Sequence, residues 1–403
     1  MAPSFDDSTI SFSRASTIAT DTAAASKRRK LLRDHHLAMI PGLPDHIAQI
    51  CLSRVPPSTL YSVCHSWRRF IYSATFPPFN SLYALSSTAT TTTPSSHNST
   101  VQLSSFDPIS SQWSVVTPTP YLSLVCLRHQ SFIARNLPIQ SVSVAGNLVL
   151  LAGTSINLLP AFSHPLIFNP LSKTWSFGPA LTTPRRWCVA GASRAAVFVA
   201  SGMGSHYTQA VARSVEKWMF RETGSFDSKR KDPNRVWQNM GSLKDGRLCR
   251  EAMDAVGCKG KLYMVNMKGP CGKEGVVYDV NSDGWSEMPA GMLDGWRGPA
   301  AAMDEETIYM VDESEGVLKR YDEAMEVWIN VLEDDMLKEA EHIVAGGGRV
   351  CVVRSGGVGI LVVDVVSPRP GLWVLDTPSG QEVLALHILP RMCPPEFQSA
   401  VVV

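Results

Sequence analysis

The stretch YDVNSDGW (278–285) recurs further along the chain as YDEAMEVW (321–328), and these two copies decide how the sequence is divided. Two earlier copies read FDPISSQW (106–113) and FNPLSKTW (168–175). Each copy combines the end of an apolar strand, a small turn that begins at Asp or Asn, and a tryptophan. Such self-similarity at a fixed period indicates a repeat architecture.

Six tryptophans mark the repeat, and five of them follow a turn of this kind. Their successive spacings are 62, 62, 48, 43 and 45 residues, so the period is near 50 with insertions in the early units. The unit around Trp237 keeps the tryptophan without the turn, whereas Val363-Asp364 precedes the last one. We expect equivalent surroundings for Trp113, Trp175, Trp237, Trp285, Trp328 and Trp373.

Pairs of apolar runs around short polar turns follow these tryptophans, as in residues 142–150, 255–265 and 300–311. Each pair is a hairpin signal. Four short strands per period of about 50 residues predict a β-propeller of kelch type. A WD40 propeller is excluded because the chain contains no Trp-Asp dipeptide.

The fold class is therefore mostly β, with six blades and a small all-α module before them. A blade cannot bury both of its faces alone, so the ring has to close. Residues 81–117 read as three strands with no partner strand before them, and residues 382–388 read as a lone strand. We predict that these two segments share the closing blade and that 382–388 forms its inner strand.

The predicted helical module lies at PGLPDHIAQICLSRVPPSTLYSVCHSWRRFIYS (41–73). Asp45 is expected to cap a short helix that Pro56-Pro57 ends, and Ser58 to cap a second helix. Apolar residues of the second helix recur at steps of three and four, which places them on one face. A module this small cannot bury such a face alone, so it needs a partner.

The order LP, an apolar helix, a proline break and VC-x-x-WR in this module resembles the F-box motif. With the propeller, the chain resembles plant F-box/kelch-repeat proteins of the Skp-interacting group over residues 27–392. The resemblance implies docking on the Skp adaptor of an SCF (Skp, cullin, F-box) ubiquitin ligase. The structural alternative is a helical hairpin packed on the β domain. The residues carried over for adaptor binding are Leu43, Pro44, Ile47, Ile50, Val63, Cys64 and Trp67.

Composition sets further limits on location and partners. The formal net charge of +1 over 403 residues predicts no attraction to nucleic acid or to an anionic membrane. Nine scattered cysteines without a C-x-x-C pair favour a reducing compartment. The basic cluster Lys27, Arg28, Arg29 and Lys30 is either a nuclear import signal or a solvated charge run. We expect a nuclear and cytoplasmic protein.

We divide the chain into a disordered tail (1–35), the F-box (37–78), the propeller (79–392) and a C-terminal tail (393–403). No catalytic constellation is found in these segments, and the ten histidines include no H-x-H or H-x-x-x-H pair. The iron motif Glu-x3-Asp-x3-His of kelch specifier proteins is also absent. We therefore expect no metal, no cofactor and no enzymatic activity.

Arginines follow three of the repeat tryptophans and precede the innermost strand of the next blade. They either hold a carboxylate or phosphate of a target by paired hydrogen bonds, or tie one blade to the next through loop carbonyls. Neighbouring tryptophans favour a binding role, since both residue types are enriched in hot spots. The candidate target-binding residues are Arg186, Trp187, Arg250, Trp296 and Arg297.

Together these features predict the substrate-recognition subunit of an SCF-type ubiquitin ligase, with the propeller holding an unknown target protein. A kelch scaffold that acts outside a ligase is the alternative. A propeller enzyme or metal-dependent specifier is a third possibility, which the missing motifs disfavour.

Overall fold

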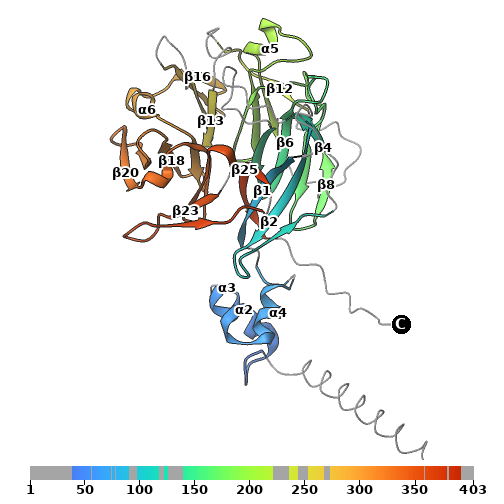
Figure 1. Ribbon diagram of the computed structural model, residues 1–403, viewed down its shortest axis with the longest axis vertical. Helices are drawn as coiled ribbons and strands as arrows, with labels where there is room; N and C mark the ends of the chain where they lie inside the picture. Colours follow the sequence, from blue (N-terminus) through green and yellow to red (C-terminus); the bar gives the residue numbers. More distant parts are fainter. Residues whose placement is uncertain are drawn as a thin grey trace, which may run out of the picture. The chain divides into compact units, whose positions relative to one another are not determined.

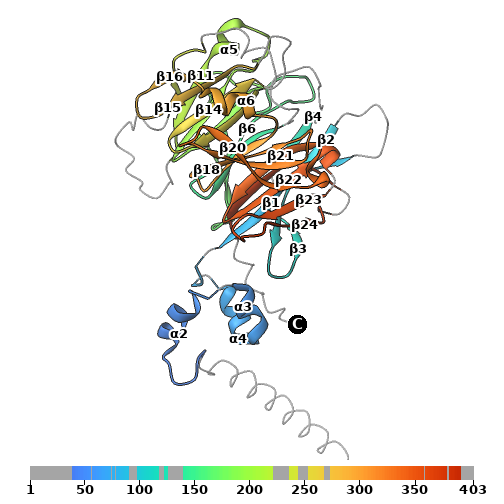
Figure 2. The ribbon, with the colours of Figure 1, turned by 90° about the vertical axis from the view of Figure 1, so that its left-hand side faces the viewer.

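The computed structural model of the chain contains two compact units, one formed by short helices and the other by residues 78–392 (Figures 1 and 2). No helix in the described part is long and apolar enough to cross a membrane. The structure describes residues 39–55, 57–73, 75–77, 79–89, 98–117, 122–125, 139–220, 236–243, 253–266, 273–357, 359–378 and 381–391.

The larger unit is a six-bladed β-propeller, as the repeat predicts. Five blades are formed by consecutive antiparallel strands, with the first strand of each innermost. In chain order these are β5 (Ile139–Val144), β6 (Asn147–Gly153), β7 (Leu166–Asn169), β8 (Thr174–Phe177); β9 (Val189–Ser193), β10 (Ala196–Ala200), β11 (Val215–Met219), β12 (Gln238–Asn239); β13 (Met253–Cys258), β14 (Lys261–Asn266), β15 (Gly275–Asp279), β16 (Gly284–Glu287); β17 (Ala300–Met303), β18 (Thr307–Asp312), β19 (Val317–Asp322), β20 (Val327–Glu333); β21 (Ala340–Gly346), β22 (Arg349–Arg354), β23 (Ile360–Asp364) and β24 (Gly371–Leu375).

The sixth blade is assembled from both ends of the propeller. Its strand order is β25 (Glu382–Pro390), β1 (Asn80–Ala89), β2 (Asn98–Asp107) and β3 (Gln112–Val115), and β4 (Leu122–Val125) also pairs with β2. The red β25 therefore lies beside the blue β1 in Figure 1. Because β25 contacts the inner strands β21 and β5, it completes the inner ring.

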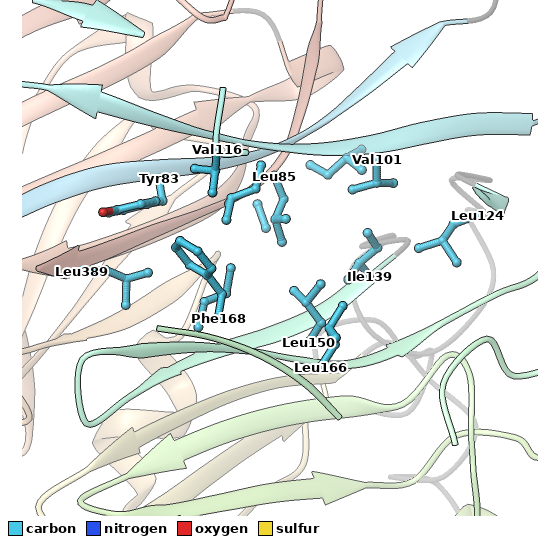
Figure 3. Packing of buried hydrophobic residues seen from close by; sticks show 14 of the residues in the cluster. Tyr83, Leu85, Val101, Val116, Leu124, Ile139, Leu150, Leu166, Phe168 and Leu389 are labelled. Atoms are coloured by element: carbon cyan, nitrogen blue, oxygen red, sulfur yellow. The ribbon is translucent and has the colours of Figure 1, made fainter. Parts of the chain in front are cut away.

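A hydrophobic cluster between the sixth blade and the β5–β8 blade holds this closure (Figure 3). Tyr83 from β1 and Leu389 from β25 pack beside Phe168 from β7, and the rings of Tyr83 and Phe168 are 6.3 Å apart. The Tyr83 hydroxyl donates to the carbonyl of Pro390, 307 residues away along the chain, at 2.9 Å. The two chain ends are thus joined by packing as well as by strand pairing.

The repeated Asp or Asn forms the turn between the third and fourth strands of five blades. Its side-chain oxygen accepts backbone N–H groups two or three residues later, an Asx turn. Asp279, for example, accepts from Asn281 at 2.8 Å and from Ser282 at 3.2 Å. The other residues in this role are Asp107, Asn169, Asp322 and Asp364.

The repeat tryptophans join neighbouring blades. Four of them donate their indole N–H to a backbone carbonyl in the segment that leaves the preceding blade, at 2.7–3.1 Å. Where the Asx turn is present, the ring also packs on the aromatic residue opposite it, as Trp285 does on Tyr278 at 5.1 Å. The donors and acceptors are Trp113 to Asp376, Trp237 to Pro179, Trp285 to Gly241 and Trp328 to Met292.

Trp373 does not share these surroundings, so the prediction of six equivalent tryptophans is wrong at this position. Its turn is longer, and Leu372 rather than Trp373 pairs with Val363. A one-residue shift turns a side chain to the other face of a strand. Trp373 is accordingly 43% exposed, with the Arg349 guanidinium 5.8 Å from its ring.

The inner strands surround a channel of about 240 Å³ on the propeller axis. His387 of β25 lines this channel beside the neighbouring inner strand β5, and its Nε2 and Nδ1 lie 2.8 and 3.0 Å from the hydroxyl oxygens of Ser141 and Ser143. Burial, and to a smaller extent the nearby His342, lowers the pKa of His387 from 6.5 to about 3. The closing strand is thus tied to the next blade by a neutral histidine.

This neutral histidine predicts acid sensitivity. The unfolded chain protonates His387 near pH 6.5 whereas the folded chain does so only near pH 3, so stability is lost as the pH falls between these values. Each pH unit corresponds to about 1.4 kcal/mol. We expect urea denaturation to show roughly 2 kcal/mol more loss between pH 6.5 and about 5 for the wild type than for His387→Gln. Parallel pH dependence of the two proteins would contradict this.

The smaller unit contains α2 (Asp45–Leu52), α3 (Pro57–Val63) and α4 (His65–Ile71). Three local predictions are wrong here. Ser58 lies inside α3 and does not cap it. Asp45 is the first helical residue rather than the cap, and its carboxylate accepts the N–H of Met39 at 3.2 Å. The expected second helix is broken at Cys64, whose backbone is extended (φ −157°), so α3 and α4 are separate helices.

The connection between β10 and β11 contains a helix, α5 (Gln209–Arg213). The apolar pattern of residues 211–220 alone predicts a single strand there, so that prediction is wrong for residues 211–213. The Thr208 hydroxyl accepts the N–H of Val211 at 3.3 Å, which caps this helix. The basic run Lys229-Arg230-Lys231 of the same blade, either a binding surface for an acidic partner or a solvated insertion, lies outside the described residues.

Candidate functional site

The helical unit exposes the apolar side chains that the F-box resemblance selects. Leu43 and Ile47 are 36% and 38% exposed, and Ile50 and Val63 are 55% and 54% exposed. Pro44 and Cys64 are exposed as well. The core of the unit is formed by other residues. Those buried residues are Ala48, Leu52, Leu60, Phe70 and Ile71.

Trp67 differs from the other residues of this set because it is half-buried. Its indole N–H donates to the carbonyl of Met39 at 2.8 Å, so it fastens the segment before α2 to α4. Arg68 in the same helix donates through Nε to the carbonyl of Tyr61 at 2.5 Å and stacks on its ring at 4.6 Å. The WR pair therefore stabilises the unit, and the exposed aliphatic residues form its free surface.

The described propeller residues of the candidate target site have different environments. Arg186 is buried and stacks on the half-buried Trp187, with 4.0 Å from its guanidinium carbon to the ring centre. Arg297 is exposed. Arg250 lies outside the described residues, as do Lys27, Arg28, Arg29 and Lys30.

The structure corrects the interpretation of Trp296. Its ring is fully buried, its N–H donates to the carbonyl of Gly298 at 3.0 Å, and it packs edge-on against Trp328. Because this ring faces the core, it offers no binding surface. Trp296 ends the short helix α6 (Ala290–Gly295), whose final turn places the indole between two blades.

Lys273 is a cation beside Arg297 that the sequence did not point to. Its Nζ donates to the carbonyls of Trp296 and Asp294 at 2.5 and 3.3 Å. Burial lowers its pKa, and the positive charge of Arg297 lowers it further. The carbonyls at the end of α6 thus hold this amine in place.

The described residues contain no group of three or more His, Cys, Asp or Glu side chains able to hold a metal ion. Burial raises the pKa of Cys188 and Cys351 to about 12 and of Cys258 to about 11, so these thiols remain protonated near neutral pH. The surface of the helices and the connections between blades are therefore the candidate sites.

A helical unit with an exposed apolar surface, joined to a six-bladed propeller with kelch-type turns, defines the F-box/kelch class of proteins. The chain is 45% identical to the F-box/kelch-repeat protein SKIP25 of Arabidopsis thaliana over 390 residues. The aligned residues cover 95% of this chain and 97% of SKIP25. The chain therefore belongs to the plant F-box/kelch-repeat family.

Two further relatives from the same plant are more distant. F-box/kelch-repeat protein SKIP4 is 23% identical over 342 residues, which cover 83% of this chain and 86% of SKIP4. F-box protein AFR is 24% identical over 290 residues, or 68% of each chain. No family model matches the sequence.

Proposed function

We propose that the protein is the substrate-recognition subunit of an SCF-type ubiquitin ligase. In this proposal the F-box helices bind a Skp adaptor and the propeller binds the target. The observation that carries it is the exposed aliphatic set of Leu43, Ile47, Ile50 and Val63, in a unit whose core is formed by other residues. Exposed apolar side chains that a small unit does not use for its own core are typical of a protein interface.

The two faces of the propeller carry different connections. Asn80, where β1 begins, pairs with Pro390, where β25 ends. Pro390 lies against Gly146 in the β5–β6 turn, and Asn80 lies near Gly347 in the β21–β22 turn. The described chain thus enters and leaves the propeller at the face with these turns. We assign target binding to the opposite face, which carries the connections between blades, since binding residues concentrate in such loops.

In this role the protein performs no bond chemistry. It raises the effective concentration of a target lysine near the charged ubiquitin-conjugating enzyme, so proximity supplies the rate increase. We propose a non-catalytic receptor without a cofactor. Because the basic cluster Lys27–Lys30 is a candidate import signal, we also propose that it works in the nucleus and the cytoplasm.

The F-box assignment predicts the effect of two charged substitutions. Ile50→Asp together with Val63→Asp places carboxylates on the exposed aliphatic surface, where desolvation opposes burial against a partner. Because both residues are more than half exposed, we expect folding to be preserved. In a pull-down from plant cells, the variant should lose the Skp adaptor and the cullin together.

Arg69→Asp is the matched control, because Arg69 is exposed on α4 and carries no adaptor-binding assignment. It should capture adaptor and cullin as the wild type does. Capture of both partners by the Ile50→Asp, Val63→Asp protein would reject the assigned surface. A wild type that brings down no cullin would instead favour a kelch scaffold outside a ligase.

A further inference from the structure

Two adjacent arginines between β8 and β9 have opposite environments. Arg185 is fully buried, and its guanidinium has hydrogen-bond partners. It donates to the carbonyls of Thr183 and Ser201 at 3.2 and 3.1 Å and forms an ion pair with Glu216. Arg186 is 8% exposed, and its one described polar side-chain contact is Nη2 to the Met203 sulfur at 3.4 Å. Its Nε and Nη1 are buried without a hydrogen-bond partner.

The backbone next to Arg186 is strained. Trp187 has φ of +52°, in the left-handed region that a bulky side chain rarely adopts. The segment is nevertheless fixed, because Arg186 and Met203 exchange two backbone hydrogen bonds at 2.8 and 2.9 Å. This conformation places the indole 4.0 Å from the guanidinium carbon. The fold therefore maintains the stacked pair at an energetic cost.

An unpaired buried guanidinium at Arg186 and a strained backbone at Trp187, both energetically unfavourable, thus occur side by side. A buried guanidinium without an anion is unfavourable, and an unsatisfied buried donor in a native protein calls for an explanation. Backbone strain likewise gathers at binding sites, where a ligand supplies the missing interaction. Burial without a compensating partner also lowers the pKa of Arg186. The missing partner of this site is an anion.

The surroundings of the site favour a protein ligand. The β8–β9 connection is hydrogen-bonded to the β6–β7 connection through Leu181 N–H and the Ser163 carbonyl at 3.0 Å. The β6–β7 connection exposes Ile156, Leu158 and Leu159 on a loop closed by the Ser155–Leu159 hydrogen bond at 2.8 Å. An ordered apolar tip and an unpaired arginine thus occur in connected loops of the face assigned to the target.

We propose that Arg186, stacked on Trp187, binds one carboxylate of the target protein. The proposal rests on the proposed function and names the chemistry of its recognition site. A single unpaired guanidinium matches a single negative charge, because the charge of neighbouring Arg185 is already neutralised by Glu216. Since Nε and Nη1 are covered in the free chain, binding includes rotation of the Arg186 side chain toward the carboxylate.

The test uses the full-length chain and an array of short random peptides, each made with a free and with an amidated C-terminus. A charge-assisted pair to arginine favours acidic peptides about tenfold or more. We expect this preference for the wild type and its loss for Arg186→Gln. The control Arg349→Gln, at an exposed arginine near Trp373, should keep it. Amidation shows whether the carboxylate is a side chain or a chain end.

Melting temperatures separate recognition from structure. Because Arg186→Gln removes an unpaired buried charge, its melting temperature should equal or exceed that of the wild type. A clear fall would show that Arg186 is a structural tie and would overturn the proposal. Absence of an acidic preference in the wild type, its persistence in Arg186→Gln, or preference for phosphoserine peptides would also overturn it. Adaptor capture by the same samples tests the ligase role separately.

Discussion

A chain that lacks residues 382–403 should not form a closed propeller. The deletion removes β25, which pairs with β1 along its length and separates the inner strands β21 and β5. Four large aliphatic side chains of β25 are buried in two different clusters. Each contributes roughly 1.5–3 kcal/mol by burial, so their loss is comparable to the 5–15 kcal/mol that stabilises a typical domain. These residues are Val383, Leu384, Leu386 and Leu389.

Thermal denaturation followed by circular dichroism checks this prediction. The truncated protein should show no cooperative transition at the wild-type temperature and should be digested rapidly by protease. Deletion of residues 393–403 alone is the matched control, because it leaves β25 intact, and it should melt as the wild type does. A peptide of residues 381–391 added to the truncated chain should restore part of the transition. Wild-type melting of the 382–403 deletion would refute closure by this strand.

The propeller was predictable because its signal is local and repeated. An aromatic residue, an Asx turn and a tryptophan lie within eight residues, and the same hydrogen bonds recur in the blades, as at Asp279 and Trp285. Trp373 was misassigned because residue type was matched without strand register. Its turn is two residues longer than that of Asp279, and Trp373 lies one residue further along the strand than Trp285 does, which places the ring on the other face.

The helical unit shows the limit of periodicity. The apolar residues between Leu60 and Ile71 fit one helical face, but the chain is extended at Cys64, so this single face does not form. Leu60, Phe70 and Ile71 on both sides of the break are buried, whereas Val63 is exposed. No local sequence signal distinguishes the two groups, because both are aliphatic or aromatic. The resemblance to the F-box motif selected the exposed residues Ile50 and Val63 where periodicity alone did not.

The sequence did not predict which side chains are buried and which partners they have, for a different reason. Arg185 and Arg186 are adjacent and chemically identical, yet Glu216, the partner of one of them, comes from β11. Only the fold determines which guanidinium meets that carboxylate. Trp296 was likewise placed in a binding site because of its neighbour Arg297, whereas the packing of two blades buries its ring.

Loss of the buried Arg185–Glu216 ion pair should have the second large effect on stability. Arg185→Met should destabilise the propeller by roughly 3–5 kcal/mol, because it leaves the Glu216 carboxylate buried at 1% exposure without its cation. The carboxylate would retain the N–H of Thr182 at 3.0 Å, which does not balance a full negative charge. The Ser201 carbonyl and the Ser214 hydroxyl would also lose their donor. Urea denaturation should show a lower midpoint with an unchanged slope.

A double-mutant cycle distinguishes a buried charge from lost packing. When Glu216→Gln is added to Arg185→Met, the unpaired charge disappears, so the double variant should be more stable than Arg185→Met alone. Additive losses would mean that the methylene groups of Arg185, and not its charge, stabilise the blade. Arg186→Met in the same loop is the matched comparison and should cost little, because no carboxylate is left behind. The two neighbouring arginines would then differ by several kcal/mol for one reason, the presence of Glu216 beside only one of them.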